Sequence, residues 1–129
     1  MHHRSYYFPY NLDIRVLRQT AAALKAHEDF ETFCKRGHQS FTTICRVFHS
    51  EWSETDSGLE YKVAANRFLR GMVRGLVGTQ LQVARGRYDV EEFENRISAK
   101  DCTLADFSVP GYGLYLEEIR YPEDEFVQD

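Results

Sequence analysis

The sequence predicts an α+β fold, in which helices cover one face of a small antiparallel sheet of the ferredoxin or RNA-recognition type. Some segments repeat an apolar residue every three or four positions, and others alternate apolar with polar residues. The order of these segments is helix, strand, strand, helix, helix, strand. The chain has 129 residues, 43% of them hydrophobic, which suffices for one compact domain spanning residues 1–129 and not for two.

The first half predicts a helix followed by a hairpin. Asn11 can cap the helix, whose apolar residues recur at helical spacing: Ile14, Leu17, Ala21 and Leu24. Residues 41–55 favour a strand because they are rich in Thr, Ile, Val, Phe and Trp. Turn-forming residues at 55–58 lead to a second, half-buried strand over 59–65, and residues 5–10 are a candidate for a further strand.

The second half predicts two helices and a closing strand. Asn66 can cap a helix over 67–84, and Asp89 with Glu92 resembles a capping box for the next helix. Residues 114–121 are predicted to form the last strand. Because a sheet this narrow leaves an edge unpaired, we expect a partner there, either another domain or a second copy.

The composition argues against several classes of protein. No apolar run approaches the roughly 20 residues that span a bilayer, so no membrane insertion is expected. The N-terminus does not resemble a signal peptide, and three cysteines without framework spacing favour a reduced, cytoplasmic protein.

Charge is unevenly distributed along the chain. The net charge is −4, yet the segment 61–88 contains six basic residues and no acid. A basic segment in an acidic chain predicts one surface that binds an anion, and the alternative is a merely solvated helix face.

The predicted helix 67–84 has two distinct sides. Leu69, Met72, Val73 and Leu76 fall on one face, which is the expected core face. Arg67, Arg70 and Arg74 fall on the opposite side, beside Gly71, Gly75 and Gly78. Because interior glycines destabilise a helix, we expect a close approach there by a backbone, a strand or an anionic ligand. The alternative is that the glycines only admit a neighbouring sheet.

At residues 65–79 the sequence resembles a known family. The stretch Ala-Asn-Arg-Phe-Leu-Arg-Gly-Met-Val-Arg-Gly-Leu-Val-Gly-Thr is similar to the hallmark motif of the TruA family of tRNA pseudouridine synthases. Residues 27–33 resemble the family's His-Asp-Phe-x-x-Phe segment with Glu28 inserted, and residues 113–116 resemble its closing Gly-Leu-x-Leu strand. The family's Arg-Thr-Asp-x-Gly-Val-His loop, which carries the nucleophilic aspartate, does not occur in this sequence.

The resemblance implies that the chain is the C-terminal, RNA-binding half of a two-domain pseudouridine synthase. The N-terminal domain with the nucleophilic aspartate would be its missing partner, and the chain alone would be inactive. The full-length enzyme would isomerise uridine to pseudouridine in the anticodon stem-loop of tRNA, without metal or organic cofactor, and would form a homodimer. The aspartate would attack the target uridine, the glycosidic bond would break, and the base would re-attach through carbon.

The resemblance also implies roles for individual residues. Arg74 matches the arginine that pairs with the aspartate, and Leu114 matches the leucine that packs against the flipped base. We expect RNA phosphates to be contacted by the other basic residues of this region: Lys62, Arg67, Arg70, Arg85 and Arg87.

Other interpretations remain to be weighed. Cys34 with His38 and Cys45 with His49 form two Cys-x-x-x-His pairs, but their spacing is irregular for zinc. The chain could instead be a stand-alone RNA-binding module without chemistry, or a ferredoxin-like ligand-binding domain whose arginines are solvated. Only the latter predicts no salt-dependent binding of tRNA.

Overall fold

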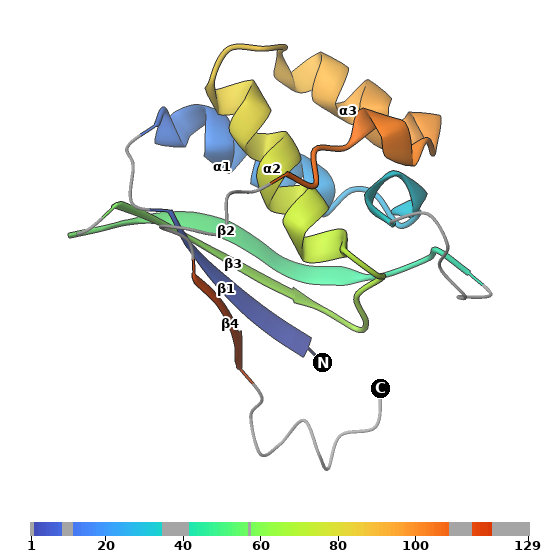
Figure 1. Cartoon of the computed structure of the whole chain (residues 1–129), viewed down its shortest axis with the longest axis horizontal. Helices are drawn as coiled ribbons and strands as arrows, with labels where there is room; N and C mark the ends of the chain where they lie inside the picture. Colours follow the sequence, from blue (N-terminus) through green and yellow to red (C-terminus); the bar gives the residue numbers. More distant parts are fainter. Residues whose placement is uncertain (1, 9–11, 35–41, 57, 109–114, 120–129) are drawn as a thin grey trace.

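The computed structural model describes residues 2–8, 12–34, 42–56, 58–108 and 115–119. All three α-helices lie on one side of a four-stranded sheet, as Figure 1 shows. The elements in chain order are β1 His2–Phe8, α1 Ile14–Leu24, η1 Glu31–Phe33, β2 Val47–Thr55, β3 Gly58–Ala65, α2 Met72–Ala84, α3 Val90–Ala99, η2 Cys102–Leu104 and β4 Tyr115–Ile119.

The strand order is β2-β3-β1-β4, and every neighbouring pair is antiparallel. This is the ferredoxin-type arrangement, so the predicted fold class is confirmed. Residues 5–8 of the candidate strand at 5–10 are confirmed as part of β1, a centre strand of the sheet between β3 and β4, and residues 9 and 10 lie outside the described residues. β2 is an edge strand, and α1 packs against it.

Alternation along β3 separates the two faces of the sheet. Leu59, Tyr61 and Val63 are buried beneath the helices, whereas Lys62 is exposed on the helix-free face. The register pairs Tyr6 of β1 with Tyr61, so Tyr6 lies on the helix side. The half-buried strand predicted over 59–65 is therefore confirmed.

A hydrogen-bonded group lies inside the core. The Trp52 and Tyr61 rings are 4.9 Å apart, and the Trp52 indole N–H donates to Gln80 Oε1 at 2.9 Å. The same oxygen accepts from the Thr20 hydroxyl at 2.9 Å. Burial raises the pKa of Tyr61 to about 12, although its hydroxyl lies 2.6 Å from the Ser50 hydroxyl. These bonds satisfy the Trp52 N–H, the Thr20 hydroxyl and Gln80 Oε1, which burial would otherwise make costly, whereas Gln80 Nε2 has no hydrogen-bond partner among the described residues.

The helix caps partly follow the prediction. The Asp89 carboxylate accepts from the Glu92 backbone N–H at 2.9 Å, which confirms the predicted start of α3. α1 is capped by Asp13, whose carboxylate accepts from the Arg15 N–H at 3.0 Å; Asn11 lies outside the described residues. No described helix is long and apolar enough to cross a membrane.

The predicted start of the central helix is wrong by five residues. α2 begins at Met72, and the preceding residue, Gly71, has a left-handed φ of 73° that a helix interior does not allow. Asn66 does not cap a helix, because its side-chain oxygen accepts from the Arg46 backbone N–H at 2.9 Å. The buried residue Leu69 belongs to the turn before α2, where Met72 N–H donates to its carbonyl at 3.0 Å.

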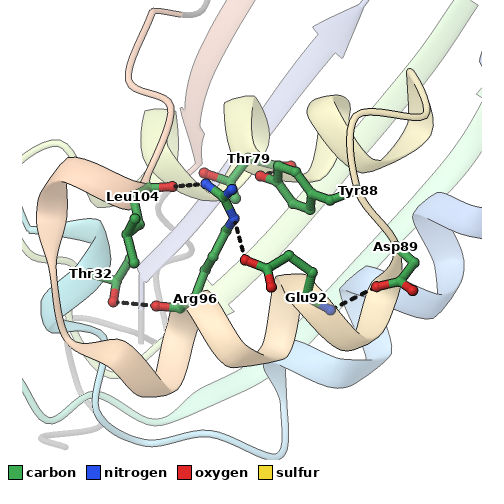
Figure 2. Close-up of polar contacts among 7 residues, drawn as sticks. All are labelled: Thr32, Thr79, Tyr88, Asp89, Glu92, Arg96 and Leu104. Atoms are coloured by element: carbon green, nitrogen blue, oxygen red, sulfur yellow. Dashed lines mark hydrogen bonds and ion pairs between the residues drawn. The ribbon is translucent and has the colours of Figure 1, made fainter.

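Arg96 fixes α3 to its neighbours (Figure 2). Its guanidinium lies 3.0 Å from the Glu92 carboxylate, donates to the Leu104 carbonyl at 3.2 Å and lies 4.1 Å from the Tyr88 ring centroid. The Arg96 carbonyl accepts from the Thr32 hydroxyl at 2.8 Å. One side chain thus ties α3, η2 and the α2–α3 turn together.

Candidate active-site face

Arg74 lies in the first turn of α2 and faces β1. Its side chain is exposed, and its positive charge acts on the hydroxyl of Tyr6, a residue only 3% exposed. Burial raises the pKa of the Tyr6 phenol, an effect that Arg74 partly opposes. Among the ion pairs between described residues, none includes Arg74.

Two arginine–aromatic contacts flank Tyr6 along β1. At the C-terminal end of α2, the Arg85 guanidinium lies 5.9 Å from the centroid of the Phe8 ring. Arg4 of β1 lies 5.1 Å from the centroid of the Phe68 ring. We call these two pairs, together with Arg74 and Tyr6, the β1 strip. Cations held against aromatic rings form a pre-arranged positive surface.

The start of α2 adds to this positive potential. The first turn contains no acidic residue, and no described side chain caps Gly71. The N-terminal end of a helix carries a partial positive charge, and Arg74 lies within that first turn. The combination favours a carboxylate or a phosphate at this end of α2.

The structure explains why one of the three glycines of the motif, Gly75, has no side chain. A Cβ atom at residue 75 would lie 2.8 Å from Phe107 Cε1 and 3.2 Å from Phe33 Cδ1. The close neighbour at Gly75 is therefore an aromatic ring of the chain itself, and the expectation of an anionic ligand at this glycine is wrong.

Asp106 holds the segment 105–108 on α2. Its backbone N–H donates to the Thr79 hydroxyl at 3.0 Å, and its carboxylate accepts from the Gln82 amide and the Ser108 hydroxyl. Partial burial alone would raise the pKa of Asp106, but the hydrogen bonds from Ser108 and Gln82 outweigh it and lower that pKa. These hydrogen bonds fix residues 105–108 against α2.

Arg67 and Arg70 do not form a helical stripe with Arg74, because both precede α2. The Arg67 guanidinium donates to the Thr42 carbonyl at 2.9 Å and ties the segment before α2 to residues 42–46. Arg70 is exposed on the turn before α2. Both residues lie at the same end of α2 as Arg74, but on a turn.

The remaining basic residues are distributed over two faces of the molecule. Arg85 and Arg87 are exposed at the far end of α2, where Arg85 lies roughly 16 Å from Arg74 along the helix axis, from the rise per residue of an α-helix. Lys62 projects from the helix-free face and lies 3.8 Å from Glu60. The sheet therefore separates Lys62 from the predicted arginines.

Two further residues of the family motifs contribute to packing. Phe30 is fully buried in the core, and His27 lies 3.5 Å from Glu94. Leu114 lies outside the described residues; the next residue, Tyr115, pairs with Tyr7 of β1.

Metal binding gains no support from the described cysteines and histidines. Cys34 and Cys45 are buried, and burial raises the pKa of both thiols. His49 lies 3.3 Å from Glu51, and His38 lies outside the described residues. Within the described ranges, no group of three or more His, Cys, Asp or Glu side chains could hold a metal ion.

The sequence interpretation missed Tyr6 and Arg4. Their signal is the alternation of Arg4, Tyr6 and Phe8 on one side of a strand. This alternation covers only five residues. It indicates a functional surface only once α2, which lies far away in the sequence, is known to pack on the same side of the sheet.

Comparison with known proteins identifies the family. A family model described as tRNA pseudouridine synthase matches residues 21–122. The chain is 38% identical over 125 residues to tRNA pseudouridine synthase A of Parabacteroides distasonis, covering 97% of this chain and 50% of that protein. It is 32% identical over 119 residues to tRNA pseudouridine synthase A of Bacillus subtilis, covering 92% of this chain and 48% of that protein.

A third relative, tRNA pseudouridine synthase A of Bacteroides thetaiotaomicron, is 38% identical over 122 residues, which cover 92% of this chain and 45% of that protein. The chain thus spans about half the length of the curated relatives that it matches. Because the family model extends over most of the sequence, the chain belongs to the tRNA pseudouridine synthase family.

Proposed function

We propose that this chain is the C-terminal half of an enzyme that isomerises uridine to pseudouridine in the anticodon stem-loop of tRNA. The missing half would supply the nucleophilic aspartate, the full-length enzyme would act as a cytoplasmic homodimer, and the chain alone would be inactive. Family membership supports the reaction class, and the half-length match to each relative supports a second domain. The observation that carries the proposal is the exposed, positively charged Arg74 beside β1, without an acidic partner among the described side chains.

Arg74 would receive the aspartate of the other half. A guanidinium at contact distance keeps a carboxylate ionised and aimed, which a nucleophile at neutral pH requires. The partial positive charge at the start of α2 acts in the same direction. Arg74 would thus be the residue through which this half completes the active site.

Leu114 would form the apolar wall against the flipped base. It directly precedes Tyr115, which pairs with Tyr7, the neighbour of Tyr6 in β1. An apolar side chain there would exclude water from the reacting base.

The arginines that flank α2 would contact RNA phosphates. These residues are Arg67, which is partly buried, and the exposed Arg70, Arg85 and Arg87. Lys62 lies on the other face, so its contact with RNA is a separate prediction.

The deciding experiment is the variant Arg74→Ala in the full-length enzyme. We expect the rate of pseudouridine formation to fall by about a hundred- to a thousandfold, while tRNA affinity changes far less. Tritium release from tRNA labelled at uridine C5 measures the rate, and filter binding measures the affinity. A near-normal rate would remove Arg74 from the active site and would favour a stand-alone RNA-binding role for this half.

A further inference from the structure

A groove runs between α1 and the edge strand β2, two elements that pack against each other. It has a volume of about 310 Å³ and is lined by Ser50–Trp52 of β2 and by Arg18, Ala21, Ala22 and Lys25 of α1 and its C-terminal cap. The four helix residues stand at positions i, i+3, i+4 and i+7, so they share one face of α1. Two small side chains thus leave room between two long cationic ones.

The β2 side of this groove presents an unpaired strand edge. β2 is the first strand in the order β2-β3-β1-β4, and its described backbone hydrogen bonds at Ser50–Trp52 belong to the ladder with β3. Half of the backbone N–H and C=O groups of an edge strand point outward. An extended peptide can therefore add to β2 as a further strand, and its helix-facing side chains would meet α1.

The groove is positively charged. Arg18 and Lys25 are exposed, and among the ion pairs of the described part of the chain none includes either residue. Glu51 belongs to the helix-free face, because it pairs with Lys62 in the register and lies 3.3 Å from His49. The added strand should therefore carry two acidic side chains on its helix-facing side.

The last residues of the sequence have this pattern. Residues 120–129, which we call the tail, lie outside the described residues, and their match to the groove is one of sequence. In an extended segment Glu125, Val127 and Asp129 would share one side, with the two acids about 13 Å apart. The two cations of the groove are seven residues apart on α1, or about 10 Å along its axis, and their flexible side chains cover the difference. Val127 would lie over the two alanines.

We propose that the groove between α1 and β2 binds residues 125–129 of a second copy of the chain as an added strand. A second copy suits the distances better than the same chain. Ile119 ends β4 at the opposite edge of the sheet, and a strand outside β2 would be four strand spacings away, about 19 Å. The six steps from Ile119 to Glu125 span about 20 Å only when fully extended in a straight line across the other strands. The inference rests on the proposed function for the homodimer, and not for the reaction.

The test reverses charges in the full-length enzyme. The groove variant carries Arg18→Glu and Lys25→Glu, and the tail variant carries the two reverse changes, Glu125→Arg and Asp129→Arg. Each variant should weaken dimerisation at least about tenfold at low salt, because two attractive pairs become repulsive. Sedimentation equilibrium measures the dissociation constant. The matched control is Asp124→Arg, whose side chain would point to the other side of the added strand, and it should stay within about twofold of wild type.

A mixture of the two variants distinguishes a second copy from the same chain. In a mixed dimer, the reversed groove of one copy meets the reversed tail of the other, and the two unchanged surfaces also meet. We therefore expect the mixture to dimerise within about threefold of the wild-type affinity, although each variant alone does not. No recovery in the mixture would mean that each tail binds its own chain or does not bind the groove, and would overturn the inference.

Three further outcomes would also contradict the inference. Unchanged dimerisation of both variants would overturn it and leave the homodimer of the proposed function intact. A groove variant that dimerises normally but loses affinity for tRNA in filter binding would assign the groove to RNA instead. A monomeric wild-type enzyme would overturn the inference together with the proposed homodimer.

Discussion

The ring of Phe107 lies so close to Gly75 that a Cβ atom at residue 75 would come within 2.8 Å of Phe107 Cε1. The contact joins the first half of α2 to the segment 105–108. That segment is also held by the hydrogen bond from the Asp106 backbone N–H to the Thr79 hydroxyl. Gly75 therefore allows the segment 105–108 to approach α2 closely.

We expect Gly75→Ala to destabilise the protein. Alanine favours a helix over glycine by about 1 kcal/mol, but overpacking against Phe107 and Phe33 costs about 1–3 kcal/mol, so a net loss should remain. Urea unfolding measures the change. Adding Phe107→Ala to Gly75→Ala should recover part of it, because the two changes share one contact. A single variant more stable than wild type would show that Phe107 moves aside freely.

Asp106 predicts a loss of stability in acid. Its pKa is lower in the folded protein than its ordinary value of 3.8, so the ionised carboxylate stabilises the fold at neutral pH. That contribution is lost as the pH falls below 3.8 through the folded-state pKa. The stability difference between wild type and Asp106→Asn should therefore shrink over this range.

Asp29 acts in the same direction, because its hydrogen bonds from Thr43 and Glu31 outweigh burial and lower its pKa. Asp29→Asn should also weaken the dependence of the unfolding free energy on pH below 3.8. Equilibrium unfolding in urea at several pH values measures the effect of each variant. A difference between wild type and Asp106→Asn that does not change with pH would contradict the role of the carboxylate.

Replacing Arg96 tests the contacts that hold α3. Lysine keeps the charge but loses the planar fork that contacts Glu92, Leu104 and Tyr88 together. We expect Arg96→Lys to lower the free energy of unfolding by about 1–2 kcal/mol. Arg15→Ala is the control: its side chain is 85% exposed beside Asp13, and it should change stability by less than about 0.5 kcal/mol. Equal effects of the two variants would refute the special role of Arg96.

The salt dependence of tRNA binding tests the phosphate contacts. Arg70→Ala in the full-length enzyme should weaken binding and reduce the slope of log K against log[salt] by about one. Arg67→Ala should reduce it as well, and it should also loosen residues 42–46, because Arg67 donates to the Thr42 carbonyl. The salt slope of Lys62→Ala tests whether the helix-free face of the sheet contacts RNA. Unchanged slopes would place the RNA elsewhere.

The sequence predicted features that depend on near neighbours. The cap at Asp89, the hairpin of β2 and β3, and the burial of Leu69 and Met72 all follow from residue type and short spacing. The start of α2 was misjudged because the buried spacing continues through the turn before it. Only the left-handed backbone of Gly71 marks the boundary, and glycine also occurs inside the helix.

The rest depended on contacts between distant parts of the chain. The assignment of Tyr6 to the helix side requires its register with Tyr61, and the effect of Arg74 on the Tyr6 phenol requires the packing of α2. Arg67 and Arg70 matched a helical stripe in the sequence, but a periodic pattern does not show where its helix begins. The family motif identified Arg74 but gave no reason to consider Tyr6.

The position of β1 in the sheet has a consequence for folding kinetics. β1 is synthesised before its partners, and its register pairs His3 with Ile119, at nearly the greatest sequence separation in the chain. Contacts of such high sequence separation form slowly, because a long loop must close first. During translation β1 stays unpaired until β3 and then β4 have been synthesised. The sheet that contains Tyr6 is therefore completed only after β4 emerges from the ribosome.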